Sequence, residues 1–180
     1  MGLRASNTVA ITLEDLRLPA DQLLGEEGMG FVYAMEGLDA GRLGIAAQAV
    51  GIARRALEHS IAYCAERRQF GQALREFQAV QFKLADMATR VEAARALAHA
   101  VAARKDRGEN VTQLASMAKL FASETAMWVT TQAVQLFGGY GYMRDFPVEK
   151  LFRDAKVTEI YEGTSEIQRI VIARGLYPGG

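Results

Sequence analysis

Apolar residues recur at every third or fourth position along three long stretches of the chain, and this spacing is typical of one face of an α-helix. The stretches cover residues 45–63, 77–101 and 117–134. Each predicts a helix of about 25 to 30 residues, or roughly 40 Å. The side chains expected to face a core are Ile45, Ala49, Ile52, Ala56 and Tyr63, then Phe77, Val80, Leu84, Met87, Val91, Ala94, Ala98 and Val101, then Met117, Leu120, Phe121, Trp128, Thr131 and Val134.

Glycines and a polar pair mark the expected ends of these helices. Gly71, Gly108 and the pair Gly138-Gly139 follow the three stretches as helix stops, and Asn110 with Gln113 is a weak capping signal for the third helix. Proline, which costs about 3 kcal/mol inside a helix, is absent from all three. The long helices are therefore expected to run without a break.

Shorter helices are predicted on either side of the long ones. Residues 30–39 are expected to form a short helix that leads into the first long one. Pro147 suits the first turn of a helix over residues 147–154. A capping box of Ser165 and Gln168 predicts a last helix running towards Arg174. Its expected stop signals are Gly175, Pro178 and the two terminal glycines.

These elements predict an all-α fold, an up-and-down four-helix bundle with short extra helices. The N-terminus does not fit it, because Val9, Ile11 and Leu13 alternate with other residues in the manner of a half-buried β-strand over residues 8–13. A lone strand leaves its backbone groups unpaired. Two interpretations stay open: an extended arm that lies on the bundle, or an orphan strand of a sheet whose other strands are missing.

Charge and composition exclude several function classes. Lysine plus arginine number 21 and aspartate plus glutamate number 21, and this balance argues against non-specific binding to nucleic acid or an anionic membrane. No stretch reaches the roughly 18 apolar residues of a membrane span. Cys64 is the only cysteine, so no disulfide framework is expected and the compartment is predicted to be reducing. With two distant histidines, the chain also offers no Cys/His metal site.

Glu162 is the residue that the pattern singles out for chemistry. It precedes the capped helix on a loop, and Gly163 beside it lets a ligand or another backbone come close. A carboxylate in this place can act as a general base. The alternative is an exposed loop glutamate that is favoured by the dipole of the following helix.

The motifs of the chain resemble those of the acyl-CoA dehydrogenase family. Ile160–Arg169, IYEGTSEIQR, is preceded by Arg153-Asp154-Ala155-Lys156 and resembles the C-terminal signature of that family. Its further matches, in the order and spacing of the family, are Met1–Ser6, Leu24–Gly28, Leu38–Arg42, Ile45–Ala49, Arg67–Gly71, Phe77-Gln78, Lys83–Met87 and Phe137–Tyr142. The resemblance covers essentially the whole chain, and the short-chain, butyryl-CoA dehydrogenase-like branch is the most similar.

The resemblance implies a flavin-dependent oxidation in fatty acid metabolism. Glu162 matches the base that removes the α-proton of an acyl-CoA thioester, while a hydride passes from the β-carbon to N5 of FAD and trans-2-enoyl-CoA is formed. Hydrogen bonds from the backbone N–H at the Glu162 position and from an FAD ribityl hydroxyl stabilise the enolate in the family. Some members carry the base at the position of Gly41, where glycine cannot serve. A branch that oxidises nitroalkanes has aspartate at the position of Glu162.

The resemblance also implies the binding residues. The FAD-binding positions are Arg67, Gln78, Gln135, Leu136, Phe137, Gly138, Gly139, Thr164, Ser165 and Glu166, and the substrate-binding positions are Asp39, Arg42 and Gly163. In the family, the contacts of Arg67 and Gln78 reach FAD across a subunit boundary. From the residues alone, Arg67 is equally an ordinary arginine at a helix C-terminus, Gly138-Gly139 a C-cap, and Arg42 a solvated residue at a helix start.

The remaining expectations concern the whole protein. Residues 1–28 are expected to be the remnant of a middle β domain with its linker, and residues 29–180 the C-terminal helical-bundle domain. The implied partners are an acyl-CoA substrate, further copies in a dimer or tetramer, and an electron-transferring flavoprotein; the location is the bacterial cytoplasm, or the mitochondrial matrix in a eukaryote. The isolated chain is expected to be inactive. The alternative is a non-catalytic helical module for oligomerisation or binding that has kept the scaffold.

Overall fold

The computed structural model describes residues 1–177, so Pro178 and the terminal glycines, which were expected to end the last helix, lie outside the described residues. The elements of the described chain are η1 (Ala20–Gln22), α1 (Gly30–Glu66), β1 (Arg68–Gln69), β2 (Gln72–Ala73), η2 (Leu74–Glu76), α2 (Gln78–Asp106), α3 (Thr112–Phe137), η3 (Gly138–Tyr142), α4 (Pro147–Val157) and α5 (Ser165–Leu176).

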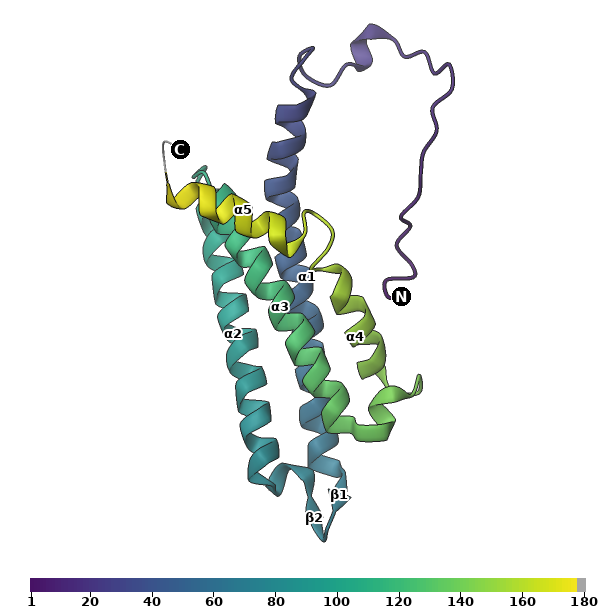
Figure 1. The fold of residues 1–180 in the computed structure, drawn as a ribbon, viewed down its shortest axis with the longest axis vertical. Coiled ribbons are helices and arrows are strands. Elements are labelled where there is room, and N and C mark those ends of the chain that lie inside the picture. The colour runs from purple at the N-terminus through teal and green to yellow at the C-terminus, as the bar shows by residue number, and fades with distance from the viewer. Residues whose placement is uncertain (178–180) are drawn as a thin grey trace.

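The predicted all-α bundle is confirmed. Helices α1, α2, α3 and α4 run alternately down and up, and α5 crosses one end of the bundle (Figure 1). Helix α3 lies at the centre and packs against all four of the others. None of the helices in residues 1–177 is long and apolar enough to cross a membrane.

Helix α1 is longer than predicted. The short helix expected at residues 30–39 and the long helix after it form one continuous helix of 37 residues. The glycines at its N-terminal half do not break it, because a glycine costs a helix only about 1 kcal/mol and the remaining residues continue the backbone hydrogen bonds. The helix ends at Glu66, and Gly71 is instead a turn residue of the two-residue hairpin β1–β2, with a φ of +85°.

The predicted face of α2 is largely correct. Met87, Val91, Ala94, Ala98 and Val101 are buried, and the three residues nearer the start of the face are half-buried. On α1, Ala49 and Ala56 are buried, whereas the larger Ile45, Ile52 and Tyr63 are half-buried. Small residues therefore form the centre of the contact, and large ones cover its edges.

The predicted face of α3 is wrong. The buried side chains of this helix are mostly small: Ala115, Ser116, Ala118, Ala122, Ser123, Ala126, Thr130 and Ala133. The large residues that the spacing favoured lie at the margin, and Phe121 is 38% exposed. A helix surrounded by four others needs small side chains so that the helix axes can approach, which outweighs the tendency of large apolar groups to be innermost.

The N-terminal segment forms no strand. Val9 and Ile11 are 70% and 80% exposed, and the chain swings away from the bundle in a wide loop (Figure 1). The interpretation as an arm lying on the bundle is therefore wrong for residues 8–13. Only the first residues return to it: the N–H of Leu3 donates to Oδ1 of Asp154 at 2.6 Å, on α4.

The last two helices differ from prediction in their termini. Pro147 begins α4 as expected, but the helix continues to Val157. Helix α5 is capped by Thr164, whose hydroxyl accepts the N–H of Ile167 at 3.5 Å, rather than by Ser165. Gln168 does not complete a capping box, because its side chain turns to the carbonyl groups of the preceding loop.

Candidate active site

The loop that carries Glu162 joins α4 to α5. Glu162 and Gly163 follow one another with φ values of +54° and +87°. This left-handed region is ordinary for glycine but uncommon for glutamate, so the surrounding structure must hold the loop in place. The N–H of Ser165 donates back to the carbonyl of Glu159 at 3.0 Å and closes the loop on itself.

Two buried side chains hold the backbone of this loop. Nζ of Lys119 on α3 donates to the carbonyl of Gly163 at 2.8 Å. Nε2 of Gln168 on α5 donates to the same carbonyl at 2.8 Å and to the carbonyl of Glu162 at 3.1 Å. Both side chains are fully buried. The two peptide groups that flank Gly163 are thereby tied to two different helices.

The carboxylate of Glu162 lies against α1. A Cβ atom built on Gly41 would lie 2.4 Å from Oε2 of Glu162 and 2.8 Å from its Cδ. Such distances do not occur between real atoms, so the absence of a side chain at Gly41 provides the space that the carboxylate fills. Glu162 is half-buried there, and the interpretation as a freely exposed loop glutamate is wrong.

A third contact ties the loop to α1. The hydroxyl of Tyr161 forms a hydrogen bond with Oε1 of Gln48. Burial raises the pKa of this hydroxyl, so it stays protonated at neutral pH and donates. The loop is thus fixed from α1, α3 and α5 on either side of the carboxylate.

Asp39 and Arg42 lie on the same helix as Gly41. Nη1 of Arg42 pairs with Oδ1 of Asp39 at 2.6 Å, and the hydroxyl of Thr112 donates to the other oxygen of Asp39. Arg42 is only 6% exposed and is far inside α1, so it is not a solvated residue at a helix start. Its Nε has no hydrogen-bond partner among the described residues. The pair borders a hollow of about 620 Å³, lined also by Val32, Met35, Glu36, Asn110, Thr112, Gln113, Val171, Arg174 and Gly175.

A second hollow, of about 590 Å³, lies at the end of the bundle near η3 and the hairpin. It contains Arg67 and the stretch Leu136–Gly139, together with Tyr63 and Tyr140. The guanidinium of Arg67 sits 5.4 Å above the ring of Tyr140. Gly138 takes a φ of +59° and caps α3, so its predicted role as a C-cap is confirmed.

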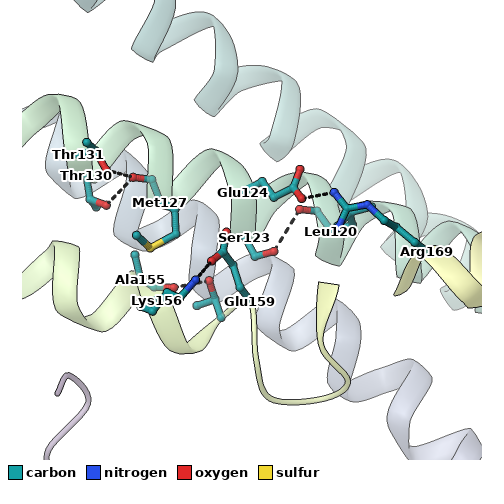
Figure 2. Close-up of polar contacts among 11 residues, drawn as sticks. Leu120, Ser123, Glu124, Met127, Thr130, Thr131, Ala155, Lys156, Glu159 and Arg169 are labelled. Carbon is teal, nitrogen blue, oxygen red and sulfur yellow. Dashed lines mark hydrogen bonds and ion pairs between the residues drawn. The ribbon is translucent and has the colours of Figure 1, made fainter. Parts of the chain in front are cut away.

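The other expected cofactor residues are dispersed. Gln78 is the exposed first residue of α2, and exposed Gln135 borders a different hollow that includes Arg4 and Arg144. Thr164, Ser165 and Glu166 open α5 beside Glu162. Ion pairs flank this end of α5: Arg169 reaches Glu124 on α3, and Lys156 reaches Glu159 (Figure 2).

A comparison with known proteins decides the family. The family profile described as "Acyl-CoA dehydrogenase, C-terminal domain" matches residues 28–177. The chain belongs to the acyl-CoA dehydrogenase family. It is 54% identical over 179 residues to an acyl-CoA dehydrogenase of Bacillus subtilis (strain 168), covering 99% of this chain and 47% of that protein. It is 53% identical to the short-chain specific acyl-CoA dehydrogenase, mitochondrial, of Bos taurus, covering 96% of this chain and 42% of that protein.

A solved structure of a family member has the same fold. Butyryl-CoA dehydrogenase of Megasphaera elsdenii superimposes with a TM-score of 0.90 at 52% identity, over 91% of this chain and 43% of that one. The chain spans less than half the length of these relatives.

The residues of this acyl-CoA dehydrogenase domain fit FAD in two separate places. At the start of α5, the buried hydroxyl of Ser165 has no partner among the described residues and can donate to a ligand oxygen. At η3, the guanidinium of Arg67 lies beside the exposed Gly138-Gly139. Most of α3 separates the two places, because Lys119 to Phe137 spans roughly 27 Å of helix. One chain therefore does not bring all the expected FAD residues together.

Lys119 and Gln168 are the residues of this site that sequence reasoning missed. A signal was present in the sequence: Lys119 falls on the same helical face as Ala115, Ala122 and Ala126. A lysine among small residues is conspicuous once that face is known to be buried. The core face was predicted from the larger apolar residues instead, and Lys119 was not singled out.

Proposed function

We propose that this chain is the base-bearing C-terminal part of an FAD-dependent acyl-CoA dehydrogenase, and that Glu162 removes the α-proton of an acyl-CoA thioester. The observation that carries the proposal is the position of the Glu162 carboxylate against α1. It occupies the space left open by Gly41 on α1, at the end of a loop whose backbone is tied to two buried side chains. A carboxylate held in this way is oriented before substrate arrives.

The reaction requires two bonds to break. The α-carbon loses its proton to the carboxylate of Glu162, the β-carbon loses a hydride, and a trans double bond forms between the two carbons. Bound FAD supplies the acceptor of that hydride. The negative charge that develops on the thioester oxygen needs a hydrogen-bond donor, and the backbone N–H of Glu162 is the candidate in this chain.

Asp39, Arg42 and Gly163 are proposed to border the acyl-CoA. Asp39 and Arg42 are paired in the wall of the 620 Å³ hollow, a few residues from Gly41. Nε of buried Arg42 has no partner among the described residues and can donate a hydrogen bond to a ligand. We expect substrate to approach the carboxylate of Glu162 from this side of α1.

FAD is proposed to bind between copies of the chain. Thr164, Ser165 and Glu166 of one copy would hold it beside Glu162. Residues from the far end of a neighbouring copy would complete the site: Arg67, Gln78, Gln135, Leu136, Phe137, Gly138 and Gly139. Arginine suits the diphosphate because its planar group donates two parallel hydrogen bonds. A homodimer or homotetramer follows from this arrangement, with electron-transferring flavoprotein as the electron acceptor of the complete enzyme.

Residues 1–28 are proposed to be the end of a preceding β domain with its linker. Exposed apolar residues at positions 9, 11 and 13 suit a strand that pairs with others of that domain. We expect residues 1–180 alone to be helical, larger than a monomer on sizing, and unable to reduce a dye with butyryl-CoA. A yellow, stoichiometrically flavinylated and active preparation of this segment would contradict that expectation.

The decisive experiment compares Glu162→Gln with Glu166→Gln in the protein that carries the preceding domains. Anaerobic bleaching of flavin absorbance by butyryl-CoA is followed by stopped flow. Loss of a general base lowers rates by about 10² to 10⁴-fold, so Glu162→Gln should lose at least that much while flavin stays bound. Glu166→Gln removes the carboxylate of a proposed FAD-binding residue and not the base, so it should bleach far faster than Glu162→Gln; a similar loss in both would point to the wrong carboxylate. Equal bleaching in parent and Glu162→Gln would refute Glu162 as the base. A parent that binds no flavin and shows no bleaching would instead favour a non-catalytic helical module.

A further inference from the structure

Lys119 is unusual among the charged residues of the chain. Its exposed fraction is 0%, although lysine is almost never fully buried unless it is paired. It takes part in no salt bridge within 4.0 Å among residues 1–177. Its hydrogen bond goes to a backbone oxygen, the carbonyl of Gly163. Burial of the Lys119 ammonium costs desolvation free energy, and the hydrogen bond to the carbonyl of Gly163 is the direct contact that offsets it.

The two carbonyl groups on either side of Gly163 hold the backbone that directly follows Glu162. The carbonyl of Gly163 receives two donors, Lys119 and Gln168, and the carbonyl of Glu162 receives Gln168. Because peptide groups are planar, fixing two successive carbonyls fixes the dihedral angles between them. Those angles are φ and ψ of Gly163, whose φ is +87°. The hydrogen bond from Gln168 also holds the peptide plane that directly follows Glu162, which restrains ψ of Glu162 in its uncommon left-handed conformation.

We propose that Lys119 and Gln168 are positioning residues, which lock the left-handed Glu162-Gly163 backbone so that the carboxylate stays in the space beside Gly41. The proposal rests on the proposed function of Glu162 as the base. It assigns no contact with substrate to either residue: both act through the loop. Lys119 supplies a charge-assisted hydrogen bond, and Gln168 supplies a neutral one that spans both carbonyls.

The charges around Lys119 give the proposal a pH signature. Burial lowers the pKa of Lys119 to about 8, with Arg42 of α1 acting in the same direction and Glu159, Glu162 and Glu166 acting against it. Above that pH the ammonium becomes an amine, which still donates but holds the carbonyl less strongly. The rate of proton abstraction should therefore decline as the pH rises through about 8.

The test uses the full-length flavoenzyme with Lys119→Met, Lys119→Arg and Gln168→Met. Lys83→Met is the matched control, because Lys83 is a half-buried lysine that bonds a side chain, Gln132, far from the loop. Three readouts are taken: kcat and KM for butyryl-CoA, their pH profiles, and hydrogen–deuterium exchange of the peptide over residues 158–166.

Displacement of a catalytic group by about 1 Å can cost about 100-fold, and we expect Lys119→Met to lower kcat by that order with little change in KM. Exchange over residues 158–166 should become faster, and flavin should stay bound. Lys119→Arg should recover part of kcat and lose the decline above pH 8, because arginine does not titrate there. Lys83→Met should behave as the parent.

Parent-like kcat together with parent-like exchange in Lys119→Met would overturn the proposal. If Lys119→Met does not fold, Gln168→Met must show the lower kcat and the faster exchange. Parent-like kcat and exchange in Gln168→Met would then overturn the proposal. Failure of the proposed function is distinguishable: Glu162→Gln would then keep its activity, while the exchange data would still report whether the two residues lock the loop.

Discussion

The regions at the two ends of α3 differ in how closely their functional residues are packed: one is held by buried side chains and the other is open. At the Glu162 end, the loop between α4 and α5 is held by buried donors from α3 and α5, and the carboxylate fits a space in α1. At the other end, Arg67 and the exposed Gly138-Gly139 border an open hollow with aromatic walls. The first region is organised entirely within the chain. The second leaves Gly138-Gly139 uncovered beside an open hollow, as the proposal of a cofactor site shared with a neighbouring copy requires.

Gly41→Ala tests whether the Glu162 end depends on that close fit. The new Cβ would overlap the carboxylate of Glu162, and the flexible side chain must move away. We expect turnover of the complete enzyme to fall by about 100-fold. Stability should not fall, because alanine is favoured over glycine in a helix by about 1 kcal/mol. Turnover and thermal unfolding measure the two effects.

Gly37→Ala is the matched control, since a Cβ at Gly37 meets nothing within 4 Å. It should gain the same helix stability and keep its turnover. Full activity in Gly41→Ala would show that the carboxylate does not need the space on α1.

Ala122→Leu tests the small-residue face of α3 that connects the two regions. Ala122 is fully buried, and extra methylene groups in a close-packed core cost about 1–3 kcal/mol. Urea unfolding followed by circular dichroism should report that loss. Phe121→Leu, at the margin of the same helix, should lower the free energy of unfolding by less. A larger loss in Phe121→Leu than in Ala122→Leu would support the core face first predicted from apolar spacing.

Lys119→Met tests, through the pH dependence of stability, whether the lysine at the Glu162 end of α3 is buried as a charged group. The pKa of Lys119 in the folded protein is about 8, below its ordinary value of 10.5. Between these values the unfolded chain binds more protons than the folded one, so the stability contributed by Lys119 rises with pH. The free energy of unfolding of the parent, relative to Lys119→Met, should therefore be higher at pH 9.5 than at pH 7. A constant difference would mean that the lysine titrates normally.

Arg67→Met probes the open region and should have the smallest effect on the fold. Arg67 is half-buried at the end of α1 and its guanidinium contacts Tyr140, so unfolding should change by less than about 0.5 kcal/mol. Retention of FAD in the oligomer should weaken instead, and the parent's salt sensitivity should diminish with the lost charge. Flavin fluorescence released on dilution measures this. A destabilised fold with unchanged FAD retention would make Arg67 a structural residue.

Local signals in the sequence were sufficient for much of the fold. The 3–4 spacing of α2 placed Met87 and Val91 in the core, and Pro147 marked the first turn of α4. Gly138 was recognised as a helix end. Each of these features depends on backbone preferences or on a helix that packs against a single surface. Such effects are determined by residues close together in the sequence.

The remaining features were decided by tertiary structure. Helix α3 has neighbours on several sides, so alanine and serine became its interior and Phe121 its margin. Gly41 and Glu162 are far apart in the sequence, and no local pattern states that one leaves space for the other. Lys119 meets Gly163 only because α3 and the loop before α5 are packed together. Motif resemblance singled out Glu162, but the groups that hold it come from three helices, and their roles exist only once those helices are assembled.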